Sequence, residues 1–219
     1  MRGQLILIEG LDRSGKSTQA GLLTERLAQA HSSQLYKFPD RSTPIGALIN
    51  KYLTDSSFQL DDHSAHLLFS ANRWELYTEL LQALNDGKFV VLDRYIYSGI
   101  AYSLAKSSLK HASSELGDVD WLYSPDKGLP KPDLTLFLSL SIEELGKRKG
   151  WGQERYELEQ FQKEVKSCFL RILDPSKDST VHLVNVEGKS IHEVQQVIWD
   201  VVVEAGCDKL TELPVQKLD

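Results

Sequence analysis

The chain has 219 residues, 41% hydrophobic and 26% charged, which is enough to bury a core, and we expect residues 1–219 to form one domain. Its net charge of −6 provides no overall attraction to polyanions, and no apolar run is long enough for a membrane helix or a signal peptide. We therefore expect no nucleic-acid or membrane partner. The two cysteines favour an intracellular location, cytoplasmic or nuclear.

Five short apolar segments have the composition of β-strands. They are Gln4–Gly10, Gln34–Phe38, Phe89–Arg94, Asp133–Leu140 and Val181–Gly188. Most are nearly continuous apolar runs, which is typical of strands covered on both faces. Segments with helical periodicity alternate with them, and this alternation predicts an α/β fold with a doubly wound parallel sheet flanked by helices.

The first strand leads into a phosphate-binding motif, "IEGLDRSGKSTQ" (Ile8–Gln19). Its fixed positions satisfy G-x-x-x-x-G-K-[ST], and the helical pattern that follows would place bound phosphates at a helix N-terminus. We expect Lys16 to reach the β- and γ-phosphates of a nucleotide and the Ser17 hydroxyl to bind Mg²⁺. The residues assigned to this loop are Gly10, Leu11, Asp12, Arg13, Ser14, Gly15, Lys16, Ser17 and Thr18.

The third strand ends in "LDRY", where Asp93 would lie near the Mg²⁺ and Arg94 would suit a second phosphate. A nucleotide switch does not need that second site. A guanine-binding switch would carry Asn-Lys-x-Asp, and the only Asn-Lys here is "NKYL" from Asn50, which lacks the Asp. The pattern therefore favours a small-molecule kinase over a switch protein.

Three arginines follow strands or lie in the phosphate loop: Arg13, Arg41 in "FPDRST" and Arg94. The carboxyl ends of parallel strands share one edge, so these side chains should face a common crevice and could hold a monophosphate. Taken singly, each could instead be a solvated surface charge. A helical pair, Phe69 and Arg73, could stack on a flat base and donate to its carbonyl, or could be a core aromatic beside a surface arginine.

Two other segments have turn-rich composition. Residues 110–132 show little periodicity, and we expect a long surface loop there, either functional or a solvated insertion. Residues 147–157, "KRKGWGQERYE", combine glycines with basic residues and could form a lid over a triphosphate, or simply a charged loop between helices. The tail after Gly206 is polar, and we expect it to be frayed.

In order, the motifs "IEGLDRSGKSTQ", "FPDRSTPIG", "DDHSAHLLFSANRWE", "DRYIYSGIAY", "GLPKPDLTLFL" and "ERYE" resemble those of eukaryotic-type thymidylate kinases, over about Gln4 to Phe169. The resemblance implies a nucleoside-monophosphate-kinase fold with a five-stranded parallel sheet and a lid. It implies transfer of the γ-phosphoryl group of ATP to dTMP, which gives dTDP and ADP, with Mg²⁺. It also implies a homodimer; apolar positions around Leu48, Leu68 and Leu76 could supply its face or could belong to the core.

The resemblance also implies a role for each site residue. Arg41 and Arg94 would bind the monophosphate, Asp12 the sugar 3′-hydroxyl and Arg13 the phosphoryl group in transit. Tyr102 would crowd the sugar 2′ position, with the catalytic set comprising Arg13, Lys16, Asp93 and Arg94. The remaining contacts implied are Phe69 and Arg73 to thymine, Phe38, Gly99 and Tyr156 elsewhere in the dTMP site, and Arg148 in the lid to adenine and phosphate, the last in a "KGWG" context that is less typical.

A deoxynucleoside kinase is the nearest rival function. In that enzyme a carboxylate such as Asp93 would deprotonate a sugar hydroxyl, whereas a monophosphate is already largely dianionic at pH 7 and needs no general base. The rival would leave Arg41 and Arg94 without a phosphate to bind. We therefore expect positioning and charge neutralisation, rather than proton abstraction, to provide the catalysis.

Overall fold

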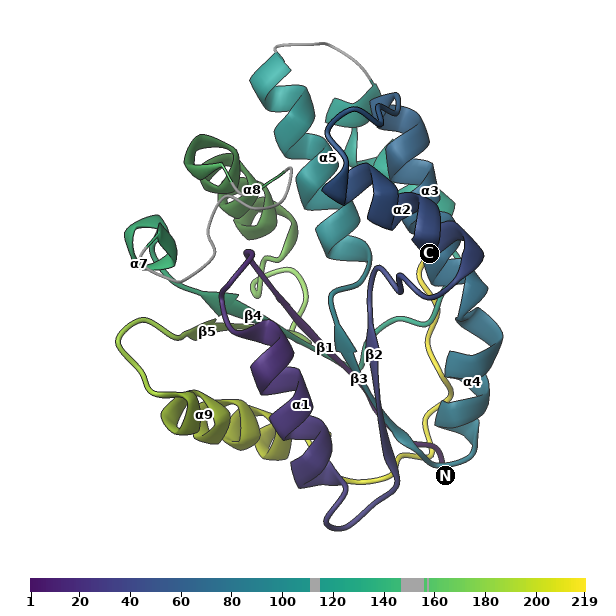
Figure 1. Cartoon of the computed structure of the whole chain (residues 1–219). Helices are drawn as coiled ribbons and strands as arrows, with labels where there is room; N and C mark the ends of the chain where they lie inside the picture. Colours follow the sequence, from purple (N-terminus) through teal and green to yellow (C-terminus); the bar gives the residue numbers. More distant parts are fainter. Residues whose placement is uncertain (111–114, 147–155, 157) are drawn as a thin grey trace.

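A computed structural model gives the fold and describes residues 1–110, 115–146, 156 and 158–219 (Figure 1). The strands are β1 (Leu5–Gly10), β2 (Ser33–Lys37), β3 (Phe89–Asp93), β4 (Leu134–Ser139) and β5 (Val181–Asn185). The α-helices are α1 (Lys16–Leu27), α2 (Pro44–Thr54), α3 (Asp62–Glu75), α4 (Tyr77–Asn85), α5 (Ile96–Lys110), α6 (Val119–Tyr123), α7 (Ile142–Gly146), α8 (Glu159–Ile172) and α9 (Ile191–Glu204). Two 3₁₀ turns flank α6, η1 (Glu115–Gly117) and η2 (Ser124–Asp126).

The five strands form one parallel sheet in the order β2-β3-β1-β4-β5. The central strand, β1, pairs with β3 through Leu5 and Val90 and with β4 through Ile6 and Leu134. The predicted doubly wound sheet is therefore confirmed. Because all strands run the same way, the chain leaves β1, β2 and β3 at one edge, and the segments that follow them meet there.

Helices cover both faces of the sheet. On one face α1 contacts α9, and on the other α5 packs against α8 (Figure 1). The four residues Leu5 to Ile8 are fully buried, as the continuous apolar run predicted. Within the described part of the chain, none of the helices has both the length and the apolar character of a membrane span.

The prediction of a surface loop over 110–132 is wrong for most of that segment. Helix α5 continues to Lys110, and η1, α6 and η2 follow, while residues 111–114 lie outside the described residues. Leu116, Leu122 and Leu129 are buried, so single turns here pack against the core. Helices of three to five residues are too short to show a 3.6-residue period, which explains why the pattern gave no helical signal.

The prediction of a frayed tail after Gly206 is also wrong. Backbone groups of Thr211 pair with those of Arg2, and Lys217 forms a bridge with Pro130. The side chain of Leu218 is buried, with 3% of its surface exposed. The tail is polar in composition, but its backbone hydrogen bonds and this one apolar anchor hold it on the protein.

Candidate active site

The loop between β1 and α1 has the backbone geometry of an anion cradle. Gly10 (φ 153°) passes so close to β4 that a Cβ there would lie 2.9 Å from the carbonyl oxygen of Leu138. Gly15 (φ 96°) caps α1, where a side chain would be strained. Helix α1 then begins at Lys16, so the N–H groups of its first turn, including those of Ser17 and Thr18, point out of the helix end.

Two loop residues that we assigned to nucleotide binding, Leu11 and Ser14, have buried side chains. Leu11 is 1% exposed and belongs to the core, which anchors the loop. Ser14 is buried, its N–H donates to the Leu11 carbonyl oxygen over 3.2 Å, and its hydroxyl has no partner among the described residues. Their side chains do not line the cavity described below, so any contact they make with phosphate would come from backbone groups.

Lys16 lies buried beneath the loop. Its Nζ donates to the Leu11 carbonyl oxygen over 2.5 Å. Burial and the neighbouring Arg94 lower the pKa of Lys16 to about 7, against the opposing effect of Asp12 and other nearby carboxylates. The nearby carboxylates therefore do not fully stabilise the protonated form of Lys16, and the negative charge of a bound phosphate would stabilise it.

Ser17 and Asp93 together form an oxygen-rich corner beside the loop. The Ser17 hydroxyl donates to Asp93 Oδ2 over 2.5 Å, while the buried Oδ1 atom has no partner among the described residues. Hard oxygen donors of this kind suit Mg²⁺, which commonly takes one or two protein ligands and completes its shell with phosphate oxygens and water. Among the described residues, no group of three or more His, Cys, Asp or Glu side chains is arranged to hold a metal ion, and a magnesium site of this kind does not require one.

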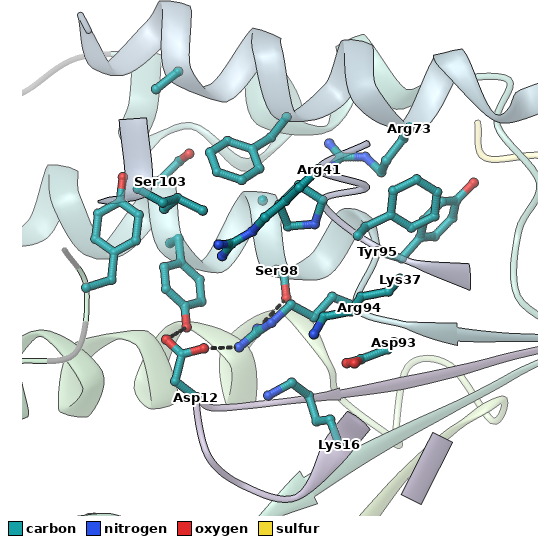
Figure 2. A pocket seen from close by; sticks show the side chains of 18 of the residues that line it. Asp12, Lys16, Lys37, Arg41, Arg73, Asp93, Arg94, Tyr95, Ser98 and Ser103 are labelled. Atoms are coloured by element: carbon teal, nitrogen blue, oxygen red, sulfur yellow. Dashed lines mark hydrogen bonds and ion pairs between the residues drawn. The ribbon is translucent and has the colours of Figure 1, made fainter. Parts of the chain in front are cut away.

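A cavity of about 330 Å³ opens directly above this corner (Figure 2). It brings together most of the site residues predicted from the sequence, although these come from segments far apart in the chain. The predicted residues that line it are Asp12, Arg13, Lys16, Ser17, Phe38, Arg41, Phe69, Arg73, Asp93, Arg94, Gly99, Tyr102 and Tyr156. Arg148 lies outside the described residues, as does all of the predicted lid except Tyr156.

Asp12 turns toward the cavity (Figure 2). Its Oδ1 atom pairs with the Arg94 guanidinium, and its Oδ2 atom accepts from the Tyr102 hydroxyl (2.8 Å) and from Gln162 Nε2 (3.1 Å). Burial alone would raise the pKa of Asp12, but the charges of Arg94 and Lys16 and the hydrogen bonds hold it below its usual value. Asp12 is thus an anionic acceptor at the boundary between the loop and the cavity.

Arg94 is held in an unusual backbone conformation, with φ 70°. Its Nη1 atom donates to the Gly10 carbonyl oxygen (3.1 Å) and to the Ser98 hydroxyl (2.9 Å). Burial would lower the pKa of Arg94, but Tyr102 and the nearby carboxylates, first among them Asp12, raise it, so the guanidinium stays charged. A non-glycine residue in the left-handed region marks a position that the surrounding structure dictates.

Glu9 is a buried carboxylate that we did not predict as part of the site. It accepts hydrogen bonds from the Tyr95 N–H, the Ser98 N–H and the Ser98 hydroxyl, and thereby ties the start of α5 to β1. Burial raises its pKa, and Arg94 opposes that change. A charged residue inside the apolar run "LILIEG" was the available signal, because a buried carboxylate needs partners.

Arg73 and Phe69 lie on α3 at the far end of the cavity. Arg73 is 2% exposed, and Asp126 binds it through two hydrogen bonds, Nε to Oδ1 (2.9 Å) and Nη2 to Oδ2 (2.6 Å). A Cβ on Gly99 would lie 3.3 Å from the guanidinium, so this glycine provides the room. Asp126 was not predicted, because nothing in "YSPDKG" indicates which side chain it meets.

The remaining predicted residues lie around the rim. Arg41, between β2 and α2, extends into the cavity and donates to Asn50 Oδ1 (3.0 Å) (Figure 2). Phe38 is 3% exposed and packs near Tyr95, and Tyr156 lies edge-on to Tyr102 with ring centroids 5.5 Å apart. The cavity also contains three basic or histidine side chains that were not predicted, namely Lys37, Lys106 and His66.

Comparison with known proteins gives a consistent result. Residues 8–198 match the family model for thymidylate kinase. The thymidylate kinase of Homo sapiens is 43% identical over 219 residues, covering 99% of this chain and 97% of that protein, and the Schizosaccharomyces pombe thymidylate kinase is 43% identical over 203 residues, covering 92% of each. Among solved structures, thymidylate kinase from Candida albicans matches with a TM-score of 0.94 and 57% identity, covering 100% of this chain and 99% of that chain.

Proposed function

The chain belongs to the thymidylate kinase family, and we propose that it transfers the γ-phosphoryl group of ATP to dTMP, giving dTDP and ADP. The observation that carries this proposal is that the phosphate loop opens into an arginine-lined cavity, with Asp12 and Arg94 paired where the two meet. A nucleotide switch needs only the loop. An arginine-lined cavity that extends away from the loop fits a phosphorylated acceptor.

The acceptor would lie along the cavity with its phosphate toward the loop. Arg41 and Arg94 both reach that end and would bind the dTMP phosphate. Asp12 would accept from the sugar 3′-hydroxyl, and Tyr102, bonded to Asp12, would limit space on the sugar's other side. Three further lining residues would shape the walls of the dTMP site, namely Phe38, Gly99 and Tyr156.

The base would meet α3. Phe69 is half-buried and lines the cavity, where it would stack on thymine. The pair with Asp126 uses Nε and Nη2 of Arg73, so Nη1 is the guanidinium nitrogen that would donate to a thymine carbonyl. Asp126 also fixes the plane of the guanidinium, which gives the recognition its direction.

Phosphoryl transfer would rest on positive charge held in place before the substrates arrive. The attacking oxygen belongs to a phosphate that is already ionised, so no residue needs to take a proton from it. Lys16 and Arg13 would stabilise charge on the transferring group, and Arg94 would neutralise the acceptor phosphate as the two phosphates approach. Residues of the predicted lid, including Arg148, would exclude water; apart from Tyr156, the lid lies outside the described residues.

The residues present fit a magnesium ion. Ser17 and Asp93 are the ligands that we assign to it, because their oxygen atoms are adjacent and the Asp93 Oδ1 atom is buried without another partner in the described part of the chain. When bound, the ion would neutralise negative charge on the phosphates of ATP.

One assay tests the function against its rivals. ADP release is measured with ATP and Mg²⁺ plus dTMP, thymidine, dUMP or no acceptor. We expect rapid turnover with dTMP and almost none with thymidine or without acceptor. Turnover with thymidine in place of dTMP would identify a nucleoside kinase, and ADP release that is independent of any acceptor would identify an ATPase or switch.

We also infer that the whole chain is one catalytic domain that works as an intracellular homodimer. All five strands share one sheet, and the two cysteines are free thiols. Of the three leucines singled out for the dimer face, Leu68 and Leu76 are partly buried against the core clusters, whereas Leu48 is 47% exposed on α2. Sedimentation at micromolar concentration should give a dimer, and a monomer would reject this assignment.

A further inference from the structure

A strap formed by residues 211–219 crosses the protein far from the reacting phosphates. Its first residue, Thr211, pairs with Arg2, whose side chain also donates through Nε to the Leu213 carbonyl oxygen (2.7 Å). The strap then runs beside α4 (Figure 1). Lys217 Nζ donates there to the Tyr77 hydroxyl (2.9 Å). These contacts fix its path from the N-terminus along α4 to the region of α3 (Figure 1).

The strap is hydrogen-bonded to the segment that follows η2. The Gly128 N–H donates to the Leu218 carbonyl oxygen (2.8 Å), and the Leu218 N–H donates back to the Leu129 carbonyl oxygen (2.9 Å). The Lys131 N–H donates to the Gln216 carbonyl oxygen (2.8 Å). Together with the buried Leu218 side chain, these bonds attach residues 128–131 to the strap on one side.

The η2 turn, which directly precedes this segment, is hydrogen-bonded to α3. The Pro125 carbonyl oxygen accepts from Trp74 Nε1 (2.8 Å), and Asp126 accepts from Ser70 Oγ (2.7 Å) and from two guanidinium nitrogens of Arg73. Asp126 is fully buried, and its carbonyl oxygen closes a turn with the Leu129 N–H (3.1 Å). The carboxylate therefore has its position set by a short turn whose next residues are bonded to the strap.

The buried ion pair between Asp126 and Arg73 couples the positions of its two side chains. The side chains of Arg73 and Asp126 are 3% and 0% exposed, so neither can turn to water if its partner moves. A shift of the Asp126 turn would have to move the Arg73 guanidinium with it or break the pair, and breaking a buried pair is costly. The strap is thus connected to the Arg73 guanidinium through two sets of contacts, those between the strap and residues 128–131 and those between Asp126 and Arg73.

We propose that the 211–219 strap is a positioning element for base recognition, which acts by holding the Asp126 turn and, through it, the Arg73 guanidinium. This rests on the proposed function, in which Arg73 donates to a carbonyl of the acceptor base. Loosening the strap weakens binding of dTMP and reduces discrimination against dCMP, whose ring carries an amino group in place of one carbonyl. It leaves phosphoryl transfer at the loop intact.

The test uses the full chain with Leu218→Ala, and Val202→Ala in α9 serves as a matched control that removes buried apolar volume elsewhere. We expect Leu218→Ala to raise the KM for dTMP roughly fivefold or more with kcat within about twofold of wild type, and to lower the ratio of kcat/KM for dTMP to that for dCMP. Leu218→Met, which restores the volume, should recover both values. If Leu218→Ala does not fold, Leu218→Val provides the same comparison with a smaller cavity.

Hydrogen exchange adds a readout that does not depend on turnover. In Leu218→Ala the amides of residues 124–131 should lose protection, and bound dTMP should restore part of it; Val202→Ala should leave them unchanged. Equal kinetic constants and base ratios for the two alanine variants would overturn the proposal. A wild-type protein that does not phosphorylate dTMP would instead overturn the proposed function, so the two failures are distinguishable.

Discussion

Lys16 offers a measurable link between charge and ligand binding. Burial and the neighbouring Arg94 lower its pKa to about 7 in the ligand-free protein, so the ammonium group is largely neutral at pH 8. A triphosphate brings negative charge into contact with Nζ and favours the protonated form. ATP binding at pH 8 should therefore take up a proton from solution.

The size of the effect follows from the pKa. With a pKa of about 7, the group is protonated to a fraction of roughly 0.1 at pH 8, so binding should take up about 0.9 proton. The same shift affects folding. The unfolded chain retains its proton up to about pH 10.5, so this group alone should make the ligand-free fold more stable, by about 1.4 kcal/mol per pH unit, as the pH rises from about 7 toward that value.

Isothermal titration calorimetry measures the uptake. ATP without Mg²⁺ or acceptor is titrated at pH 8 in two buffers with different ionisation enthalpies, and the dependence of the observed heat on that enthalpy gives the number of protons. At this pH the triphosphate is itself fully ionised and adds little. Lys16→Arg keeps a permanent charge and should show almost no uptake. An uptake below about 0.2 proton in the wild type, or an equal uptake in Lys16→Arg, would refute the reasoning.

Three further predictions concern named side chains. Arg13→Ala should lower kcat by about 10³-fold in steady-state assays with dTMP affinity within about twofold, and a wild-type kcat would remove Arg13 from catalysis. Asp12→Asn should raise the KM for dTMP by about tenfold because the sugar 3′-hydroxyl loses its charged acceptor, and an unchanged KM would argue against a sugar contact. Asp126→Asn should lower the free energy of unfolding in denaturant melts by about 3 kcal/mol, because the buried Arg73 loses its charged partner, and a change below about 1 kcal/mol would show that the pair is dispensable.

The sequence predicted best where function constrains spacing. The phosphate loop could be placed from four fixed positions because its backbone geometry demands glycine at Gly10 and Gly15. Strand order at the sheet edge then brought Arg41 and Arg94 into one cavity without any knowledge of side-chain packing. The strands themselves were predictable because buried parallel strands are apolar throughout.

The partners of those residues could not be predicted in the same way. Asp126 meets Arg73 across more than fifty residues of chain, and Gln162 reaches Asp12 from α8; no local pattern connects such pairs. Glu9 was visible as a charge in an apolar strand, but the N–H groups that satisfy it belong to a helix start whose position depends on the whole sheet. Motif spacing therefore located the side chains that line the cavity, and tertiary packing decided which partners hold them in place.

The strap has a consequence for how the protein is made. Residues 211–219 leave the ribosome several seconds after the Asp126 turn, at ordinary rates of synthesis. Until then the N–H groups of Gly128 and Lys131 lack the carbonyl groups that they bind in the finished fold. The backbone pairing of Arg2 with Thr211 cannot form either. The phosphate loop, built from the first strand and helix, can close much earlier. If the proposed function and the role of the strap hold, the nascent chain should therefore complete its phosphate-binding loop first and its selectivity for the base last.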